Sequence, residues 1–356
     1  MKNQLTLADL IPERKRISKS YYISKCPFHT GEVPALLSKE DEFSCIVCGA
    51  AGDAAEYLAR RIHVTREDVL RDQGILKEAK VPKRIYEALQ EAANYYVWRL
   101  SSEFGDKGRM YLSERKIIPK VQKTFQIGMS GPYGNSLHKK LSDGGFSEEE
   151  LRETGLFIED KNTGEPMDRF FNRVMFPITD ETGRVIGFGG RILPGDKSPA
   201  KYVNSPESEV YKKRENLYAM DISKASKQGF LILCEGYMDV IAMHQAGFDN
   251  AVASLGTALT EEQCNLMHLY TDRVVVLYDS DEAGQNATFK ALKLLKKGGF
   301  HTRVANYSGL GKDPDEVLKT AGRQAMIEVI RKSESGTSFL LRHMTAGEAV
   351  DLLLQS

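Results

Sequence analysis

The sequence lacks the apolar segments that would carry it into or across a membrane. No apolar run approaches the roughly 18 residues that a membrane span needs. The amino terminus, MKNQLTLADLIPERK, has no apolar stretch of the kind found in a secretory signal. Internal repeats and low-complexity segments are absent as well. The sequence therefore predicts a cytoplasmic protein built from ordinary globular domains.

Net charge is also missing, since 49 Lys and Arg residues balance 49 Asp and Glu residues. A zero sum neither supports nor excludes binding to nucleic acid, so the positions of the charges matter more. The charges gather in three basic segments (14–19, 184–201 and 212–214) and three acidic segments (near 235, 279–282 and 313–316). Basic surface beside an acidic cluster suits a metal-dependent enzyme that acts on nucleic acid, whereas ordinary solvated faces are the alternative.

Cysteine is scarce, with five in 356 residues, and three of the five lie in the first fifty. In a cytoplasmic chain, a close cluster of cysteine and histidine indicates metal binding rather than a disulfide. The cluster is Cys26 and His29 in CPFH, followed after fifteen residues by Cys45 and Cys48 in CIVCG. Three thiolates and one imidazole at this spacing fill a closed tetrahedral zinc site. The zinc would be structural, because it lets a small module fold without a large core.

The chain is long enough for two or three domains, and its 41% hydrophobic and 28% charged residues are typical of globular proteins. Changes in pattern along the chain predict an α+β multidomain fold. The expected segments are a zinc ribbon at 1–76, a linker at 77–83, a mixed α/β subdomain at 84–228, an α/β subdomain with a mostly parallel sheet at 229–333 and a short tail at 334–356.

Periodicity predicts the main elements within these segments. In the zinc module, Asp53 and Glu56 indicate the start of a helix, and Thr65 starts another that Gly74 ends. The mixed subdomain should contain one long amphipathic helix over 83–104 and two hairpins, at 156–170 around NTG and at 173–193 around DETG. Four nearly continuous apolar runs predict buried parallel strands at 230–234, 250–255, 273–278 and 302–307, separated by helices at 237–246, 260–271 and 282–297.

Acidic residues follow two of these strands directly. Glu235 comes after FLILC, and Asp279 and Asp281 come after RVVVLY. Ligands of open parallel sheets bind beyond the carboxyl ends of the strands, so these carboxylates should converge there. Converging carboxylates repel one another unless a cation lies between them, and a hard divalent ion fits oxygen ligands. A third motif, GKDPDE at 311–316, can complete the cluster, and the alternative is that Asp281 and Asp315 cap helices while the other acids lie in solvated turns.

A glycine-rich hairpin carries the candidate phosphate-binding residues. GFGGR at 187–191 would bring phosphate close to the backbone and ends in an arginine that can bind it bidentately. KYVNS at 201–205 and Lys213 follow. The segment is not a Walker-type loop, because Gly-Lys-Ser/Thr is absent. A solvated basic hairpin is the alternative.

The zinc motif, from CPFH through FSCIVCG to GDAAEYL, resembles the zinc module of DnaG-type bacterial primases. In it, Phe28 and Phe43 could pack the ribbon or stack on bases, and packing is favoured for Phe28 because it lies inside the ligand loop. The acidic motifs EGYMD and YDSDEAG resemble the TOPRIM fold that primases share with topoisomerases and some nucleases. Flanking segments resemble the primase polymerase domain: DRFFNRVMFPITDETGRVIGFGGRIL, KYVNSPES, YKKRENLY, AVASLGTALT and GKDPDEVL.

The resemblance covers most of the chain and implies a DNA primase, a nucleotidyltransferase that makes short RNA primers from ribonucleoside triphosphates on single-stranded DNA. It implies one structural Zn²⁺ and a catalytic Mg²⁺ or Mn²⁺ held by Glu235, Asp279 and Asp281. The acids that it implies as support are Asp239, Asp313 and Asp315. The residues that it implies as contacts to the incoming nucleotide or the template are Arg173, Arg191, Lys201, Tyr202, Asn204 and Lys213.

Members of this family carry a larger helical domain after the polymerase core, which binds the replicative helicase. Only residues 334–356 follow here, so any helicase partner is expected to be reached without that domain. Two other functions stay open. One is a TOPRIM nuclease or topoisomerase, although no domain with a nucleophilic tyrosine is evident. The other is a non-catalytic, zinc-dependent protein that binds single-stranded DNA, against which the intact acidic positions argue.

Overall fold

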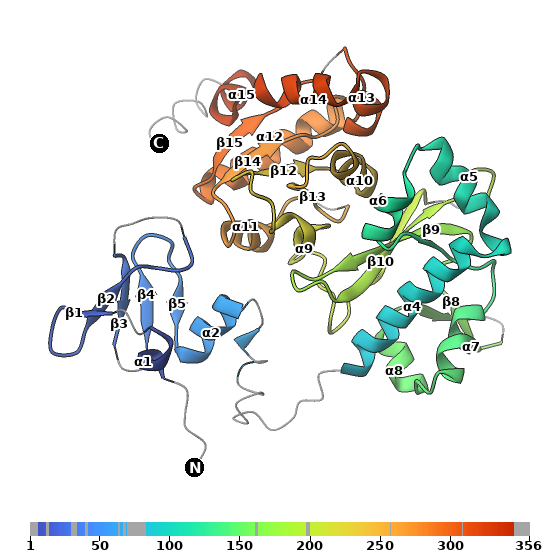
Figure 1. Cartoon of the computed structure of the whole chain (residues 1–356), viewed down its shortest axis with the longest axis horizontal. Helices are drawn as coiled ribbons and strands as arrows, with labels where there is room; N and C mark the ends of the chain where they lie inside the picture. Colours follow the sequence, from blue (N-terminus) through green and yellow to red (C-terminus); the bar gives the residue numbers. More distant parts are fainter. Residues whose placement is uncertain are drawn as a thin grey trace. The chain divides into compact units, whose positions relative to one another are not determined.

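The structure is a computed structural model that describes residues 6–11, 14–29, 34–39, 42–62, 65–66, 69, 83–160, 163–196, 200–256, 258–307 and 309–344. The chain divides into two compact units, one formed by residues 1–81 and 268–271 and the other by residues 82–267 and 272–356 (Figure 1). The linker expected at 77–83 and the helix expected from Thr65 to Gly74 lie largely outside the described residues. None of the helices in the described ranges is both long and apolar enough to cross a membrane.

The first unit is a small antiparallel sheet with short helices. Its five strands lie in the order β1-β2-β3-β4-β5. The elements are α1 (Leu7–Leu10), β1 (Lys15–Arg16), β2 (Tyr22–Ser24), β3 (Leu36–Ser38), β4 (Phe43–Cys45), β5 (Ala51–Gly52) and α2 (Ala54–Ile62). Asp53 caps α2 as expected, since its Oδ1 accepts a hydrogen bond from the Glu56 N–H at 2.9 Å.

Three aromatic rings form the centre of this small core. Phe28, Phe43 and Tyr57 are buried, and their ring centroids lie 5.2–5.8 Å apart. The rings join the zinc-ligand loop, β4 and α2, and edge-on contacts of this kind add to the area that they bury. Phe28 therefore packs the ribbon, as expected.

The second unit begins with an antiparallel sheet in the order β11-β10-β9-β6. Its strands are β6 (Gly128–Met129), β9 (Arg173–Thr179), β10 (Val185–Ile192) and β11 (Tyr202–Asn204). The hairpin predicted at 173–193 is confirmed, because β9 and β10 pair antiparallel along their length. The other predicted hairpin is also confirmed, as β7 (Phe157–Glu159) paired with β8 (Pro166–Asp168).

One long helix, α4 (Lys83–Ser101), packs across a face of this sheet and confirms the helix predicted over 83–104 (Figure 1). Its apolar stripe is buried, and Tyr96 meets Phe188 of β10 edge-on at 5.3 Å. The helix ends where the Ser102 side chain accepts from the Phe104 N–H and starts the 3-10 turn η1 (Glu103–Gly105). The shorter helices around it are α5 (Asp106–Glu114), α6 (Pro119–Thr124), α7 (Ser136–Asp143), α8 (Glu148–Glu153) and α9 (Met220–Ser223).

The second sheet of this unit has the order β13-β12-β14-β15-β16, and its first four strands are parallel. Its alternating elements are β12 (Leu231–Cys234), α10 (Tyr237–Gln245), β13 (Ala251–Ala253), α11 (Glu261–His268), β14 (Arg273–Val276), α12 (Glu282–Lys297) and β15 (His301–Val304). All four predicted strands and all three predicted helices are confirmed. Because β13 and β14 lie on opposite sides of β12, the winding of the chain reverses beside β12, and such a switch point is where open sheets bind ligands.

The segment expected as a short tail at 334–356 begins inside the fold. After α13 (Pro314–Thr320) and α14 (Gly322–Arg331), β16 (Glu334–Ser335) adds an antiparallel edge strand to β15. Helix α15 (Gly336–His343) then packs against α12 and β15. A Cβ on Gly336 would lie 2.1 Å from Thr302 Oγ1, so the close approach needs glycine. A two-residue strand leaves too little periodicity to predict.

The packing of α4 on the sheet leads to a prediction about stability. Phe188 is fully buried against Tyr96, so Phe188→Ala should lower the free energy of unfolding in urea by about 3–5 kcal/mol. Phe104→Ala is the control, because that ring is 56% exposed and its loss should cost less than about 0.5 kcal/mol. Equal losses in the two variants would contradict the packing.

Candidate functional site

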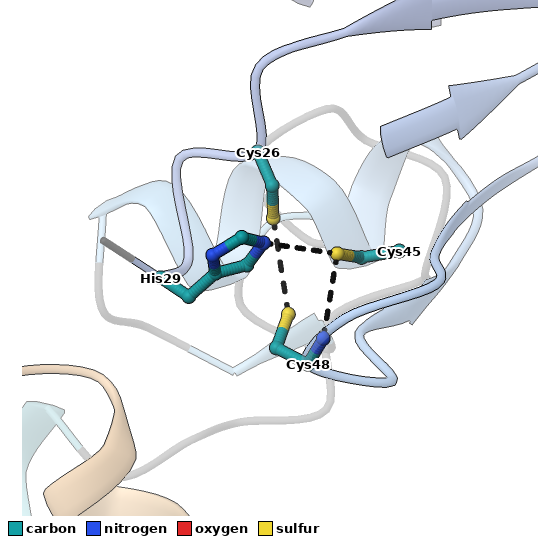
Figure 2. A group of neighbouring side chains, drawn as sticks. All are labelled: Cys26, His29, Cys45 and Cys48. Carbon is teal, nitrogen blue, oxygen red and sulfur yellow. Dashed lines mark hydrogen bonds between the residues drawn. The ribbon is translucent and has the colours of Figure 1, made fainter. Parts of the chain in front are cut away.

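Four ligand atoms meet at one point of the first unit (Figure 2). The Sγ atoms of Cys26, Cys45 and Cys48 and a ring nitrogen of His29 all lie within 4.8 Å of one another. The Sγ atoms of Cys26 and Cys48 are 3.8 Å apart. Zn–S bonds of about 2.3 Å in a tetrahedron put two sulfur atoms about 3.8 Å apart. The four atoms therefore fit a closed tetrahedral zinc site with no position left for a substrate.

Backbone N–H groups point at two of the sulfur atoms. The Phe28 N–H lies 3.5 Å from Cys26 Sγ, and the N–H groups of Val47 and Cys48 lie 3.4 and 3.5 Å from Cys45 Sγ. Burial raises the pKa of the Cys26 thiol. At Cys45 burial also acts to raise the pKa, but hydrogen bonds from the two N–H groups and from the Cys48 and Cys26 side chains together outweigh it and lower the pKa to about 7. A bound cation would stabilise all three thiolates, so the donor set fits Zn²⁺.

The acidic residues predicted from the parallel strands lie at the switch point beside β12. Glu235 follows β12, and its Oε1 accepts from the Asp279 N–H at 2.9 Å, which ties together the ends of β12 and β14. Asp281 caps α12 by accepting from the Gly284 N–H at 2.8 Å. Gly284 is required there, because a Cβ would lie 2.2 Å from the Asp279 carbonyl oxygen and 2.9 Å from Glu235 Oε1.

A cavity of about 300 Å³ opens at this sheet edge, between the acidic strand ends and the antiparallel sheet. Its lining includes Arg115, Lys201, Tyr202, Asn204, Glu235, Tyr237, Asp239, Asp279, Lys312, Asp313 and Asp315. Carboxylates and cations from distant parts of the chain thus face one space. Asp281 is exposed and lies outside this lining.

The carboxylates in the cavity are poorly solvated. Burial raises the pKa of Glu235, and the charge of Asp281 adds to the effect. Burial and the neighbouring Glu235 and Asp313 raise the pKa of Asp279 to about 7, and burial raises the pKa of Asp239 well above its ordinary value. Within the described ranges, Asp279 Oδ1 is buried and has no hydrogen-bond partner. An unpartnered oxygen among like charges suits a hard divalent cation, so these residues fit one.

The acidic residues lie at the carboxyl ends of neighbouring strands, as expected, but their carboxylate oxygens do not meet at one point. Among the described residues, the group whose ligand atoms all lie within 4.8 Å is the cysteine and histidine cluster, and no acidic triad meets this limit. Two carboxylates instead accept from helix N-termini, Asp281 from the Gly284 N–H and Asp313 from the Glu316 N–H at 2.7 Å. Mutual repulsion favours this splayed arrangement. The helix-capping alternative is therefore confirmed for Asp281 and wrong for Asp315, because Asp313 is the residue that caps α13, and the metal hypothesis stays a prediction.

Arg115 is a residue of the cavity that sequence analysis missed. It is the C-cap of α5, and its Nη1 donates to Oδ2 of Asp315 at 3.0 Å. Asp315 is 4% exposed and also accepts from Lys319, so two cations compensate its buried charge. The pair joins residues 200 positions apart, and no motif surrounds Arg115 to indicate it.

Three of the six predicted nucleotide contacts line the cavity: Lys201, Tyr202 and Asn204. Arg191 lies beside them, with its guanidinium 4.5 Å from the Tyr111 ring centroid and 5.9 Å from that of Tyr202. The two rings and the Ile192 carbonyl oxygen, which accepts from Arg191 Nη1 at 2.7 Å, together restrict the orientation of the guanidinium.

Arg173 and Lys213 lie outside the cavity lining. Arg173 is 4% exposed, and its Nη1 donates to the carbonyl oxygens of Gly190 at 3.0 Å and Ala200 at 3.2 Å. It therefore ties the hairpin to the segment before β11, and its burial argues against the expected contact with nucleic acid. The Lys213 backbone is held by Glu207 and Gln263.

Three segments of the chain match known families. Residues 1–82 match a CHC2 zinc finger, residues 95–224 match the N-terminal domain of the DNA primase catalytic core, and residues 232–318 match a Toprim-like domain. The second match contains the strands of the antiparallel sheet, and the third contains most of the mainly parallel sheet but ends before β16.

Curated relatives are similar along nearly the whole chain. The DNA primase of Clostridium acetobutylicum is 35% identical over 92% of this chain and 57% of its own length. The DNA primase of Aquifex aeolicus is 35% identical over 94% of this chain and 68% of its own length. For most of these relatives, the chain spans little more than half of their length.

Solved structures agree with these similarities. The zinc-binding and RNA polymerase domains of Aquifex aeolicus primase share 33% identity, with a TM-score of 0.67 over 98% of this chain and 88% of that chain. A DnaG primase catalytic domain bound to single-stranded DNA shares 32% identity, with a TM-score of 0.67 over 75% of this chain and 84% of that chain.

The zinc geometry predicts the metal content. Wild-type protein should carry one zinc per chain, and Cys45→Ser should lose it, because removal of one ligand opens the tetrahedron. Cys264→Ser is the control, since Cys264 is a buried thiol of α11 outside the cluster. Atomic absorption measures the zinc, and full zinc content in Cys45→Ser would contradict the site.

The acidic cavity predicts that Mg²⁺ changes the stability of the wild type and of a variant lacking the Asp279 charge in different ways. In buffer without Mg²⁺ and without a chelator, Asp279→Asn should raise the midpoint of thermal unfolding by a few degrees, because it removes one of several repelling charges. Mg²⁺ should then stabilise the wild type but not the variant, since ligand binding favours the folded state. Asp143→Asn, an exposed change on α7, should behave like the wild type. The same Mg²⁺ response in all three proteins would exclude Asp279 as a ligand.

Proposed function

We propose, since the chain belongs to the DNA primase family, that it synthesises short RNA primers from ribonucleoside triphosphates on a single-stranded DNA template. The observation that carries the proposal is the cavity in which acidic strand ends face Lys201, Tyr202 and Asn204 of the antiparallel sheet. One side of this cavity suits a divalent cation, and the other suits a nucleotide. Template-directed nucleotidyl transfer needs both in one place.

We assign Glu235, Asp279 and Asp281 as the residues that hold Mg²⁺ or Mn²⁺. Asp279 offers a buried oxygen without a hydrogen-bond partner among the described residues. Glu235 accepts a hydrogen bond from the Asp279 N–H and so fixes the Asp279 backbone. When bound, the cation would supply Lewis-acid activation of a 3′-hydroxyl and stabilise the leaving pyrophosphate. Asp239 and Asp313 line the same cavity and would add to its negative potential.

The cationic side of the cavity would hold the triphosphate and the template backbone. Lys201 is exposed at the rim, and the Arg191 guanidinium is oriented by the rings of Tyr111 and Tyr202. Such contacts position nucleic acid without reading its sequence. Arg115 lines the cavity too, but its pairing with Asp315 suits it to joining the end of α5 to the start of α13.

We assign a structural Zn²⁺ to Cys26, His29, Cys45 and Cys48, and binding of single-stranded DNA to the module that it stabilises. The sheet of this module presents Tyr21, which is 46% exposed, and the exposed basic residues Lys15 and Arg16. Aromatic rings beside cations suit unpaired bases and their phosphates. A cytoplasmic location and a replicative helicase as a further partner stay predictions from the sequence.

Glu235→Gln tests the catalytic assignment. The change removes one charge and keeps the shape, so primer synthesis should fall by at least about 100-fold while the thermal midpoint and DNA binding stay near wild type. The assay combines oligonucleotide templates of varied sequence, labelled ribonucleotides and Mg²⁺ or Mn²⁺. Glu261→Gln is the control, because Glu261 is an exposed residue of α11 paired with Lys297.

The outcomes separate the candidate functions. Retained synthesis in Glu235→Gln would remove Glu235 from the mechanism. No product of two nucleotides or more from the wild type, with either metal, would count against the proposed function. Nicking of supercoiled plasmid without primers would favour a TOPRIM nuclease, and tight DNA binding without metal-dependent activity would favour an accessory protein.

A further inference from the structure

A row of three cross-strand neighbours crosses the antiparallel sheet beside the cavity. Phe176 of β9, Gly189 of β10 and Asn204 of β11 lie directly opposite one another in register. Their side-chain positions therefore share one face of the sheet. Gly189 has no side chain, so the middle of the row is open.

Tyr237 of α10, from the other sheet of the unit, fills this opening. A Cβ on Gly189 would lie 2.5 Å from Cζ of the Tyr237 ring, so no larger residue fits beneath it. The ring stacks on Phe176 with centroids 5.5 Å apart and planes 12° apart. The Tyr237 hydroxyl donates to Oδ1 of Asn204 at 2.8 Å. One tyrosine therefore contacts every member of the row.

These contacts set the orientation of the Asn204 amide. Its Oδ1 accepts from Tyr237, and its Nδ2 donates to the Leu255 carbonyl oxygen at 2.8 Å. A primary amide has two N–H donors, so one N–H is left for a ligand in the cavity that Asn204 lines. If the Tyr237 bond were lost, the amide could rotate and exchange its donor and acceptor.

We propose that Tyr237 is a positioning residue, which sets Asn204 and strand β11 relative to Glu235. Tyr237 follows Glu235 by two residues, so the distance from the acidic strand end to the nucleotide-binding strand depends on one rigid ring. This inference rests on the proposed function, because it assumes that Asn204 contacts the nucleotide. A small displacement of a group that binds a reactant weakens that binding, so loss of the Tyr237 hydroxyl should weaken nucleotide binding by Asn204.

Tyr218 offers a matched control from the same aromatic cluster. Its ring centroid lies 4.7 Å from that of Tyr237, and it is only 2% exposed. Within the described part of the chain, its buried hydroxyl has no hydrogen-bond partner. Tyr218→Phe thus removes a buried hydroxyl without removing a hydrogen bond, whereas Tyr237→Phe removes both.

The experiment measures KM and kcat for ribonucleotides in the primer assay, together with the thermal midpoint. Tyr237→Phe should raise KM about three- to tenfold, the value of one hydrogen bond, with the midpoint within about 2 °C of wild type. Tyr218→Phe should leave both KM and the thermal midpoint near the wild-type values. A KM for Tyr237→Phe within twofold of wild type, or an equal rise in both variants, would overturn the proposal.

A double-mutant cycle tests whether Tyr237 acts through Asn204. Asn204→Ala should raise KM, and adding Tyr237→Phe to it should have no further effect, because coupled residues are not additive. If the increases in KM of the two single variants multiply in the double variant, the two residues act independently and the proposal is wrong.

A separate binding measurement distinguishes this inference from the proposed function. If the wild type makes no primers, the proposed function fails, and the same variants are titrated with a fluorescent ATP analogue in Mg²⁺. Weaker binding by Tyr237→Phe than by wild type and Tyr218→Phe would support the positioning role. Equal binding by all three would refute it.

Discussion

The second unit depends on the burial of like charges at the junction of its two sheets. Glu235, Asp279 and Asp239 meet there because parallel strands end at one sheet edge, and burial makes their ionised forms unfavourable. Three interactions reduce this cost: the Asp279 N–H that binds Glu235, the helix N-termini that receive Asp281 and Asp313, and the cations beside Asp315. Among the described residues, Asp279 Oδ1 stays without a hydrogen-bond partner, and this oxygen supports the cation site that we propose.

Two glycines let the parts of this site approach closely. Gly284 admits the turn after β14 against the start of α12, where the positive end of the helix lies beside the acids. Gly189 admits the Tyr237 ring against β10. In both places a methyl group would collide with a neighbouring group, so the absence of a side chain sets how closely the two segments approach there.

The stability of the first unit depends on a metal site rather than on a large apolar core. Its sheet is small and its core rests on the three rings of Phe28, Phe43 and Tyr57, which is little apolar area for independent stability. A metal that binds three thiols and an imidazole links the loops at one end of the sheet and adds folding free energy directly. The closed ligand set also leaves this metal no open position for a substrate, whereas the catalytic metal that we propose would be held by carboxylate oxygens of the second unit.

The sequence by itself determined the features that depend on the spacing of residues close together in the chain. The structure has three local patterns as predicted: the two ligand pairs of the zinc motif, the alternation of strands and helices after residue 229, and the acids that follow β12 and β14. Tertiary structure alone decided the ion pair of Arg115 with Asp315, the burial of Arg173 and the contact of Tyr237 with Gly189 and Asn204. These contacts join residues from 17 to 200 positions apart, and such pairs leave no periodic signal in the chain. Whether a charged side chain binds a ligand or the protein's own backbone depends on what the fold brings to it, and spacing along the sequence does not contain that information.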